Sequence, residues 1–68
     1  MENLIKSFQE KGEEFFVDFR FIDDTNFEIS SSQCEIKFDK NFVILSTENL
    51  ATIVNLDNVT SFDISTKL

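Results

Sequence analysis

The sequence predicts a mainly β domain, in which an N-terminal α-helix precedes a five-stranded, strongly bent antiparallel sheet that curls into a small barrel. Two observations predict this class. Apolar residues recur at helical spacing near the start of the chain and at alternating positions after it. Nine phenylalanines occur with no tyrosine or tryptophan, and rings without a polar group belong in a core or an interface.

The 68 residues are expected to form one domain, with the helix at about 2–11 and the barrel at about 14–65. A chain this short buries only about 60% of its unfolded surface, so its stability margin is thin. Cys34 is the only cysteine and histidine is absent, which excludes an internal disulfide and disfavours a structural zinc site. Homo-oligomerisation, as a ring or another assembly, is therefore expected to supply further stability.

Residues Glu2–Lys11 predict a short helix. Leu4, Ile5 and Phe8 form one apolar stripe along it, and the remaining positions are mostly polar. Gly12 follows at the position where a left-handed residue ends many helices. A helix of about ten residues does not persist alone in water, so it must dock on the sheet.

The first strand is predicted at 15–21, where four odd-numbered apolar residues share one face. Asp23–Asn26 supplies a turn. The second strand starts at Phe27 and resumes at Cys34, but its apolar positions change from odd to even across Ser30–Gln33. Alternation cannot survive such a change, so a bulge or sharp bend is predicted there.

A tight hairpin follows, in which the polar turn Asp39–Asn41 joins the apolar segments Cys34–Phe38 and Phe42–Leu45. The segment Phe42–Leu45 is apolar on both faces. Such a strand is expected to be covered twice, by the sheet interior and by the helix or a neighbouring chain.

The remaining chain predicts a fourth strand at Ala51–Leu56, a two-residue turn at Asp57–Asn58 and a fifth strand at Val59–Ile64. The residues from 65 to 68 are expected to fray.

The order of a helix and five short strands resembles the Sm-like fold, a small barrel of the SH3-like kind, and in particular its bacterial Hfq-like branch. Two segments carry the resemblance, which runs from about Leu4 to Ser65. Phe38–Leu45 (FDKNFVIL) is similar to the end of the first Sm motif, and Ile53–Val59 (IVNLDNV) is similar to the second. The resemblance implies rings of six or seven subunits, in which the fourth strand of one subunit pairs with the fifth of the next, and binding of RNA.

The resemblance also implies the RNA-binding residues. In the archaeal branch of the family the turn Asp and a nearby Asn contact the base, and these correspond to Asp39 and Asn41. The candidate RNA-binding residues are Asp39, Lys40, Asn41, Asn55, Asp57 and Asn58, with Lys37 as a further nearby cation. Leu56 and Asp57 stand where Hfq-like proteins carry Lys and His, which removes donors and adds negative charge. Asp and Asn are also favoured in turns that bind nothing, which is the competing interpretation.

The net charge of −7, from 13 acidic and 6 basic residues, opposes phosphate binding, which normally draws on an excess of Lys and Arg. The functional hypothesis is therefore an Sm-like, Hfq-like oligomeric binding module with altered or lost RNA binding. The alternatives are an acidic barrel that binds a basic protein partner, and a structural component of a larger assembly.

Catalysis is not expected, because the chain has no histidine, no glycine-rich phosphate loop and no Cys-His or Ser-His arrangement. No cofactor and no metal are predicted. The first 14 residues lack the pattern of a signal peptide, and no stretch approaches the roughly 18 apolar residues of a membrane span. A cytoplasmic setting without a membrane partner is expected, in which Cys34 acts as a small buried hydrophobe.

Overall fold

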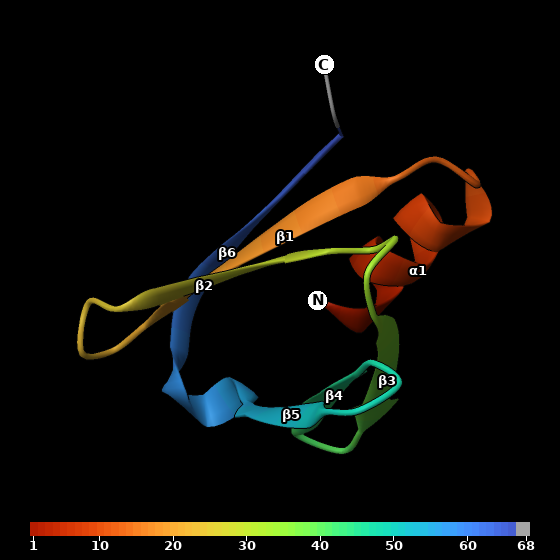
Figure 1. The fold of residues 1–68 in the computed structure, drawn as a ribbon. Helices are drawn as coiled ribbons and strands as arrows, with labels where there is room; N and C mark the ends of the chain where they lie inside the picture. Colours follow the sequence, from red (N-terminus) through yellow and green to blue (C-terminus); the bar gives the residue numbers. More distant parts are fainter. Residues whose placement is uncertain (67–68) are drawn as a thin grey trace.

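A computed structural model describes residues 1–66 as a helix followed by six strands and one 3₁₀-helix. The elements in chain order are α1 (Glu2–Glu10), β1 (Phe15–Phe21), β2 (Asn26–Ser30), β3 (Glu35–Asp39), β4 (Phe42–Ser46), β5 (Ala51–Asn55), η1 (Leu56–Asn58) and β6 (Val59–Thr66). The strands form two three-stranded antiparallel sheets (Figure 1). Sheet A has the order β2-β1-β6, and sheet B has the order β3-β4-β5.

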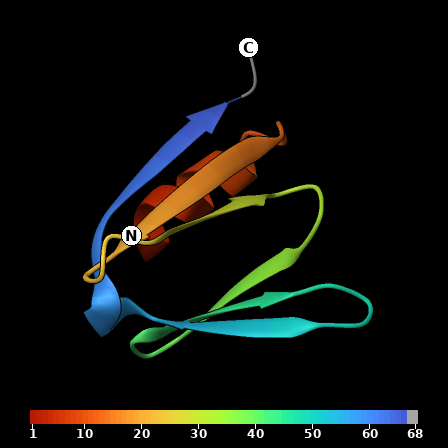
Figure 2. The same ribbon diagram turned by 60° about the vertical axis from the view of Figure 1, so that its left-hand side comes forward.

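The mainly β class and the N-terminal helix are confirmed, but the single five-stranded sheet and the closed barrel are wrong. The predicted second strand is divided into β2 and β3, one in each sheet, by a turn over residues 31–34. The place of the break is the place where the apolar alternation changes phase. Figure 2 shows the two sheets as separate layers joined through this turn and through η1.

Hydroxyl groups explain why the strand breaks rather than bends. The hydroxyl of Ser31 accepts a hydrogen bond from the backbone N–H of Phe15 at 2.9 Å, and the Ser31 N–H donates to the Phe15 carbonyl at 2.9 Å. The Glu14 carboxylate accepts from the hydroxyl of Ser30 at 2.7 Å and from that of Ser32. The polar groups of the serine segment thus bond with Glu14 and with the start of β1, and they do not need the backbone hydrogen bonds of a continuous strand.

Helix α1 closes one end of the space between the sheets. Its Ile5 is fully buried, and the rings of Phe8 and Phe15 lie 5.7 Å apart between centroids at a tilt of 46°. Gly12 ends the helix with φ of 75°, and its N–H donates to the Gln9 carbonyl at 3.2 Å. The predicted role of Gly12 as a helix terminator is confirmed, because this conformation favours a residue without a β-carbon.

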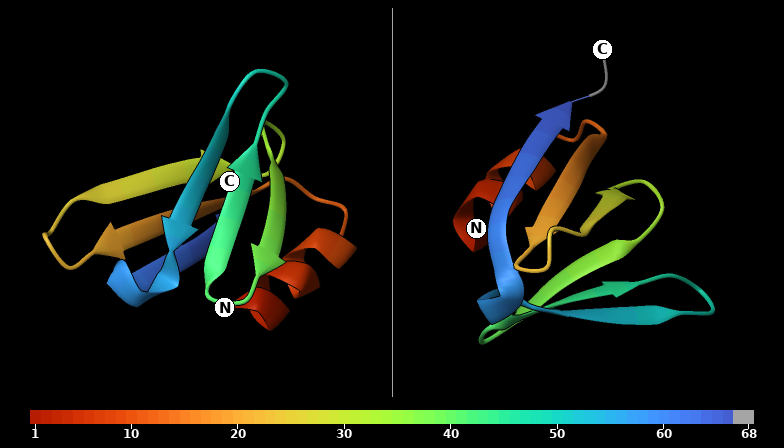
Figure 3. Two further views of the ribbon diagram at one scale, coloured as in Figure 1. Left: turned by 90° about the horizontal axis from the view of Figure 1, so that it is seen from below. Right: turned by 90° about the vertical axis from the view of Figure 1, so that its left-hand side faces the viewer.

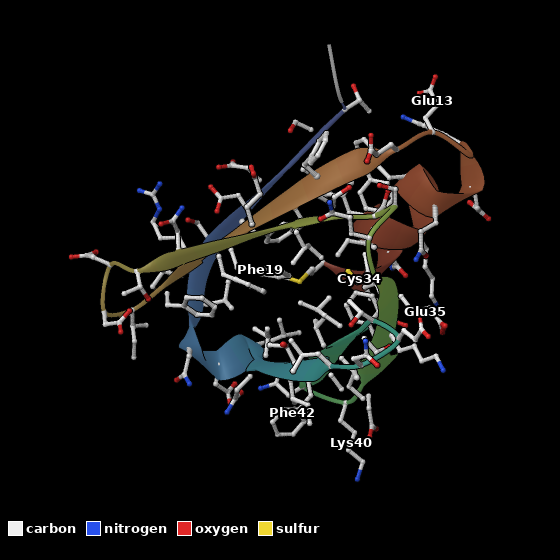
Figure 4. All side chains as sticks on the ribbon, viewed as in Figure 1. Glu13, Phe19, Cys34, Glu35, Lys40 and Phe42 are labelled. Carbon is white, nitrogen blue, oxygen red and sulfur yellow. The ribbon has the colours of Figure 1, made fainter. Side chains whose placement is uncertain are left out.

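The core lies between the inner faces of the two sheets. The odd-numbered side chains of β1 point into it, and Phe19 points from β1 toward sheet B (Figure 4). The buried apolar residues are Ile5, Phe15, Val17, Phe19, Ile29, Val43, Leu45 and Val54. Helix, sheet A and sheet B each contribute, so the three parts share one hydrophobic cluster.

The C-terminal third differs from the prediction in three places. The strand that was predicted as the fourth is β5, and it stops at Asn55 instead of Leu56. The predicted turn at Asp57–Asn58 is instead the 3₁₀-helix η1, which includes Leu56. Strand β6 continues to Thr66, which pairs with Phe15, so the expected fraying is wrong for residues 65 and 66. Residues 65 and 66 are held in place because β6 pairs with β1 along the full length of β1. The expectation for 67–68 lies outside the described residues.

None of the helices in residues 1–66 has the length and apolar character needed to cross a membrane.

Candidate nucleic-acid interface

The first predicted site segment is the turn of the β3–β4 hairpin. Asp39 and Phe42 are the last register pair of the ladder, so Lys40 and Asn41 form a two-residue turn. Lys40 has φ of 55°, in the left-handed region that a residue with a β-carbon rarely adopts. Glycine or asparagine would occupy this position at lower energetic cost, and Asp24 in the turn between β1 and β2 adopts the same conformation, with φ of 68°.

The second predicted site segment is the turn from β5 into η1. Asn55 adopts an extended conformation and caps η1, because its side-chain oxygen accepts a hydrogen bond from the Asp57 N–H at 3.0 Å. The carbonyl of Asn58 accepts from the N–H of Ile22 at 3.0 Å, which ties the end of η1 to the turn after β1. Local side-chain capping of this kind fixes the position of the whole segment.

The structure brings the two segments together at one end of sheet B. The N–H of Leu56 donates to the carbonyl of Asn41 at 2.9 Å, and Phe42 is paired with Asn55 in the ladder. The six predicted residues, Asp39, Lys40, Asn41, Asn55, Asp57 and Asn58, therefore lie at the same end of sheet B, which we call the two-turn end. Segments that lie 14 residues or more apart in the sequence meet here because β4 and β5 are neighbours in the sheet.

The charge of the two-turn end is unfavourable for phosphate. Asp39 and Asp57 contribute two carboxylates against the single ammonium group of Lys40. The other predicted cation, Lys37, lies on β3 beside Glu35, with 3.4 Å between the ammonium nitrogen and a carboxylate oxygen. If a nucleic acid binds at the two-turn end, its binding would thus depend on contacts with the bases rather than with the phosphate backbone.

Aromatic residues that the sequence did not single out lie at the same end. Asn55 and Asn58 line an open pocket of about 440 Å³ together with the rings of Phe21 and Phe27. Phe42 is 41% exposed at the start of β4, and Figure 4 shows Phe42 and Lys40 pointing away from the rest of the molecule. The alternation of apolar residues in the sequence places Phe27 on the inner face of β2, opposite Phe19. It does not reveal that β2 is an edge strand of sheet A, where the ring stays partly exposed.

The thiol of Cys34, the one cysteine of the chain, is remote from the two-turn end. Cys34 is half-buried, burial raises the pKa of its thiol, and its Sγ lies 3.6 Å from the Ser30 carbonyl as a hydrogen-bond donor. A thiol that keeps its proton is a poor nucleophile. Within residues 1–66 no three acidic, cysteine or histidine side chains gather in a way that could hold a metal ion.

Comparison of the chain with protein-family models, with curated proteins and with solved structures finds no match. The Sm-like relationship and the RNA-binding role of the two-turn end therefore stay predictions.

Proposed function

We propose that this protein is a non-enzymatic binding module of the Sm type that assembles with copies of itself, through pairing of the β5 edge with β6 of a neighbouring copy. The observation that carries this proposal is the difference among the four edge strands of the two sheets. β3 has three charged residues in five, and β2 and β6 have one each, whereas β5 (ATIVN) has none. Charged residues protect an edge against pairing, so β5 is the least protected edge within residues 1–66.

The hydrogen-bond pattern of sheet B shows which groups β5 presents. The Thr47 N–H donates to the Leu50 carbonyl at 2.7 Å, and at the other end of the ladder the Leu56 N–H donates to Asn41. Bonded and non-bonded pairs alternate in an antiparallel ladder. The backbone groups of Ala51, Ile53 and Asn55 consequently point away from β4, toward the open edge.

Pairing of β5 with β6 of another copy is a head-to-tail contact. The same two edges are used once each by every subunit, so the contact repeats and generates a closed ring if the rotation permits it. The thin stability margin of a 68-residue chain favours such an assembly, because each added ladder satisfies backbone groups that water would otherwise solvate.

A substitution of Ile53 tests this assembly. Ile53→Pro removes the edge N–H that points away from β4 and keeps an apolar side chain, and proline is tolerated at such edge positions. Ile53→Val is the matched control, since it retains the N–H. Light scattering coupled to size-exclusion chromatography at about 100 μM should give several subunits for the wild type and Ile53→Val, and fewer for Ile53→Pro. A wild-type mass of one subunit would overturn the proposal.

Binding of single-stranded RNA at the two-turn end is a second candidate function. It is favoured by the pocket in which Asn55 and Asn58 lie beside the rings of Phe21 and Phe27, because amides bind base edges and rings stack on bases. Fluorescence anisotropy with short U-rich and A-rich RNA at low salt tests it. Asn58→Asp keeps the side-chain shape and adds a negative charge, so it should weaken binding. Absence of wild-type binding at tens of micromolar would exclude this function.

The alternative of an acidic module that binds a basic protein stays a prediction as well. Its surface would be the outer face of sheet A, where Asp18 lies directly opposite Asp63 on one side and Glu28 on the other.

A further inference from the structure

The outer face of sheet B carries an apolar stripe. Ile44 on β4 and Ile53 on β5 are direct cross-strand partners, and Phe42 lies two residues along β4 on the same face. Ile53 is 65% exposed and Phe42 is 41% exposed. We call these three residues the sheet B stripe. The segment Phe42–Leu45 is apolar on both sides because Val43 and Leu45 point into the core, whereas Phe42 and Ile44 belong to the stripe on the outer face.

No element of residues 1–66 covers the sheet B stripe. Figure 3 (left) shows sheet B in front, with the helix and sheet A behind it, so of the two expected covers of β4, the helix or a neighbouring chain, the helix is excluded. Helix α1 instead packs at the inner side, through Ile5. The other exposed large apolar residues lie singly on the helix, on the edge strand β2 or in turns, as is normal for a protein surface; they are Leu4, Ile22, Phe27 and Leu50.

The charges around the stripe are balanced. Lys37 is the direct cross-strand partner of Ile44, and Asp39 is that of Phe42. Glu35 lies two residues from Lys37 on the same face, and Lys40 follows in the turn. The face thus has two carboxylates and two ammonium groups along the β3 side of an apolar centre, whereas the outer face of sheet A has a row of three carboxylates across its strands.

We propose that a second copy of this chain packs on the sheet B stripe, face to face, around a two-fold axis. A two-fold contact requires a surface that complements itself. The alternating charges along Glu35, Lys37, Asp39 and Lys40 meet this requirement, because reversing the direction of the partner's β3 places each ammonium group opposite a carboxylate. An apolar centre with a polar rim is also the usual composition of a homodimer interface.

This contact is independent of the edge pairing proposed above. Edge pairing uses backbone groups in the plane of the sheet, whereas face packing uses side chains that project from it. The two contacts can coexist, and face packing then doubles the number of subunits that edge pairing brings together.

A charge-exchange experiment tests the face contact. The first variant, Lys37→Glu with Lys40→Glu, makes the face acidic; the second, Glu35→Lys with Asp39→Lys, makes it basic. Each variant alone should have half the mass of the wild-type assembly by light scattering, because its faces repel one another. An equimolar mixture of the two should regain the full wild-type mass.

The helix provides a matched control. Lys6→Glu with Lys11→Glu changes the net charge by the same amount as the first variant, away from the stripe, and should leave the mass unchanged. All four exchanged side chains on the face are exposed, and circular dichroism verifies that the variants fold. The mass of the wild-type assembly should be twice that of the acidic-face variant whether the edge contact forms or not. Equal masses for the acidic-face variant and the wild type, or a mixture that stays at half mass, would overturn the face contact.

Discussion

The backbone N–H of Leu56 lies 2.9 Å from the carbonyl oxygen of Asn41, and this hydrogen bond joins the two turns of the candidate site. It extends the β4–β5 ladder by one pair beyond the strands themselves. The residue before η1, Asn55, holds the same turn from the other side, because its side-chain oxygen caps η1 by accepting from the Asp57 N–H.

We expect Asn55→Ala to lower the free energy of unfolding by about 1 kcal/mol, the usual loss when a cap is removed from a helix start. Asn55→Asp keeps an acceptor oxygen in the same place and should lose far less. Urea denaturation followed by circular dichroism measures both. Equal losses for the two variants would show that the side-chain oxygen does not cap η1.

The two neighbouring apolar residues of α1 should respond differently to truncation. Ile5 is fully buried and Leu4 is 49% exposed. Ile5→Ala should lower the free energy of unfolding by about 2–5 kcal/mol, because it leaves a cavity between the sheets. Leu4→Ala should change it by less than about 0.5 kcal/mol. Thermal unfolding compares the two, and a larger loss for Leu4→Ala would contradict the docking of the helix through Ile5.

The carboxylate row on the outer face of sheet A should reduce stability. Asp63 is directly opposite Asp18, and like charges in this relationship repel. Asp63→Lys should therefore raise the free energy of unfolding by about 0.2–1 kcal/mol at low salt. The gain should shrink in about 1 M NaCl, where the screening length is about 3 Å.

Ser61 provides the matched control for this change. Ser61 is opposite Arg20, so Ser61→Lys places two positive charges together and should lower stability where Asp63→Lys raises it. A gain in both variants would mean that added positive charge stabilises this acidic chain irrespective of position.

The turn between β1 and β2 should make stability depend on pH in the acid range. Hydrogen bonds from the hydroxyl of Thr25, at 2.6 Å, and from its backbone N–H lower the pKa of Asp23. A lowered pKa in the folded state stabilises the fold above the unfolded-state value and not below the folded-state value. The wild type should thus be more stable than Asp23→Asn at pH 7, and this difference should begin to shrink as the pH falls below about 4 and vanish below the folded-state pKa. A difference that does not change with pH would contradict the role of the charged carboxylate.

The sequence was informative where one side chain decides the local structure. The alternation over 15–21 placed β1 correctly, Gly12 ended the helix, and the change of phase at Ser30–Gln33 marked the point where the chain leaves one sheet for the other. The sequence did not reveal that the serines would separate two strands. That outcome depends on Glu14 and Phe15, which are about 16 residues away and become partners only in the folded chain.

The sequence motifs name six candidate site residues, but they do not reveal what surrounds these residues in the fold. The six residues could be named from two short motifs, and their meeting follows from the pairing of β4 with β5. The pocket beside Asn55 and Asn58 depends on Phe21 and Phe27 of the other sheet, so no local pattern contains it. The apolar outer side of β4 was visible in the sequence, but the element that would cover it was not.

The position of β1 between β2 and β6 has a consequence for folding kinetics. Sheet B is a meander of three consecutive strands and can form from neighbouring segments, whereas sheet A needs Phe15 to meet Thr66 across almost the entire chain. Closing so long a loop is slow compared with hairpin formation. We expect the meander to form first and β6 to join last, so a nascent chain would expose the edge of β1 until β6 is synthesised.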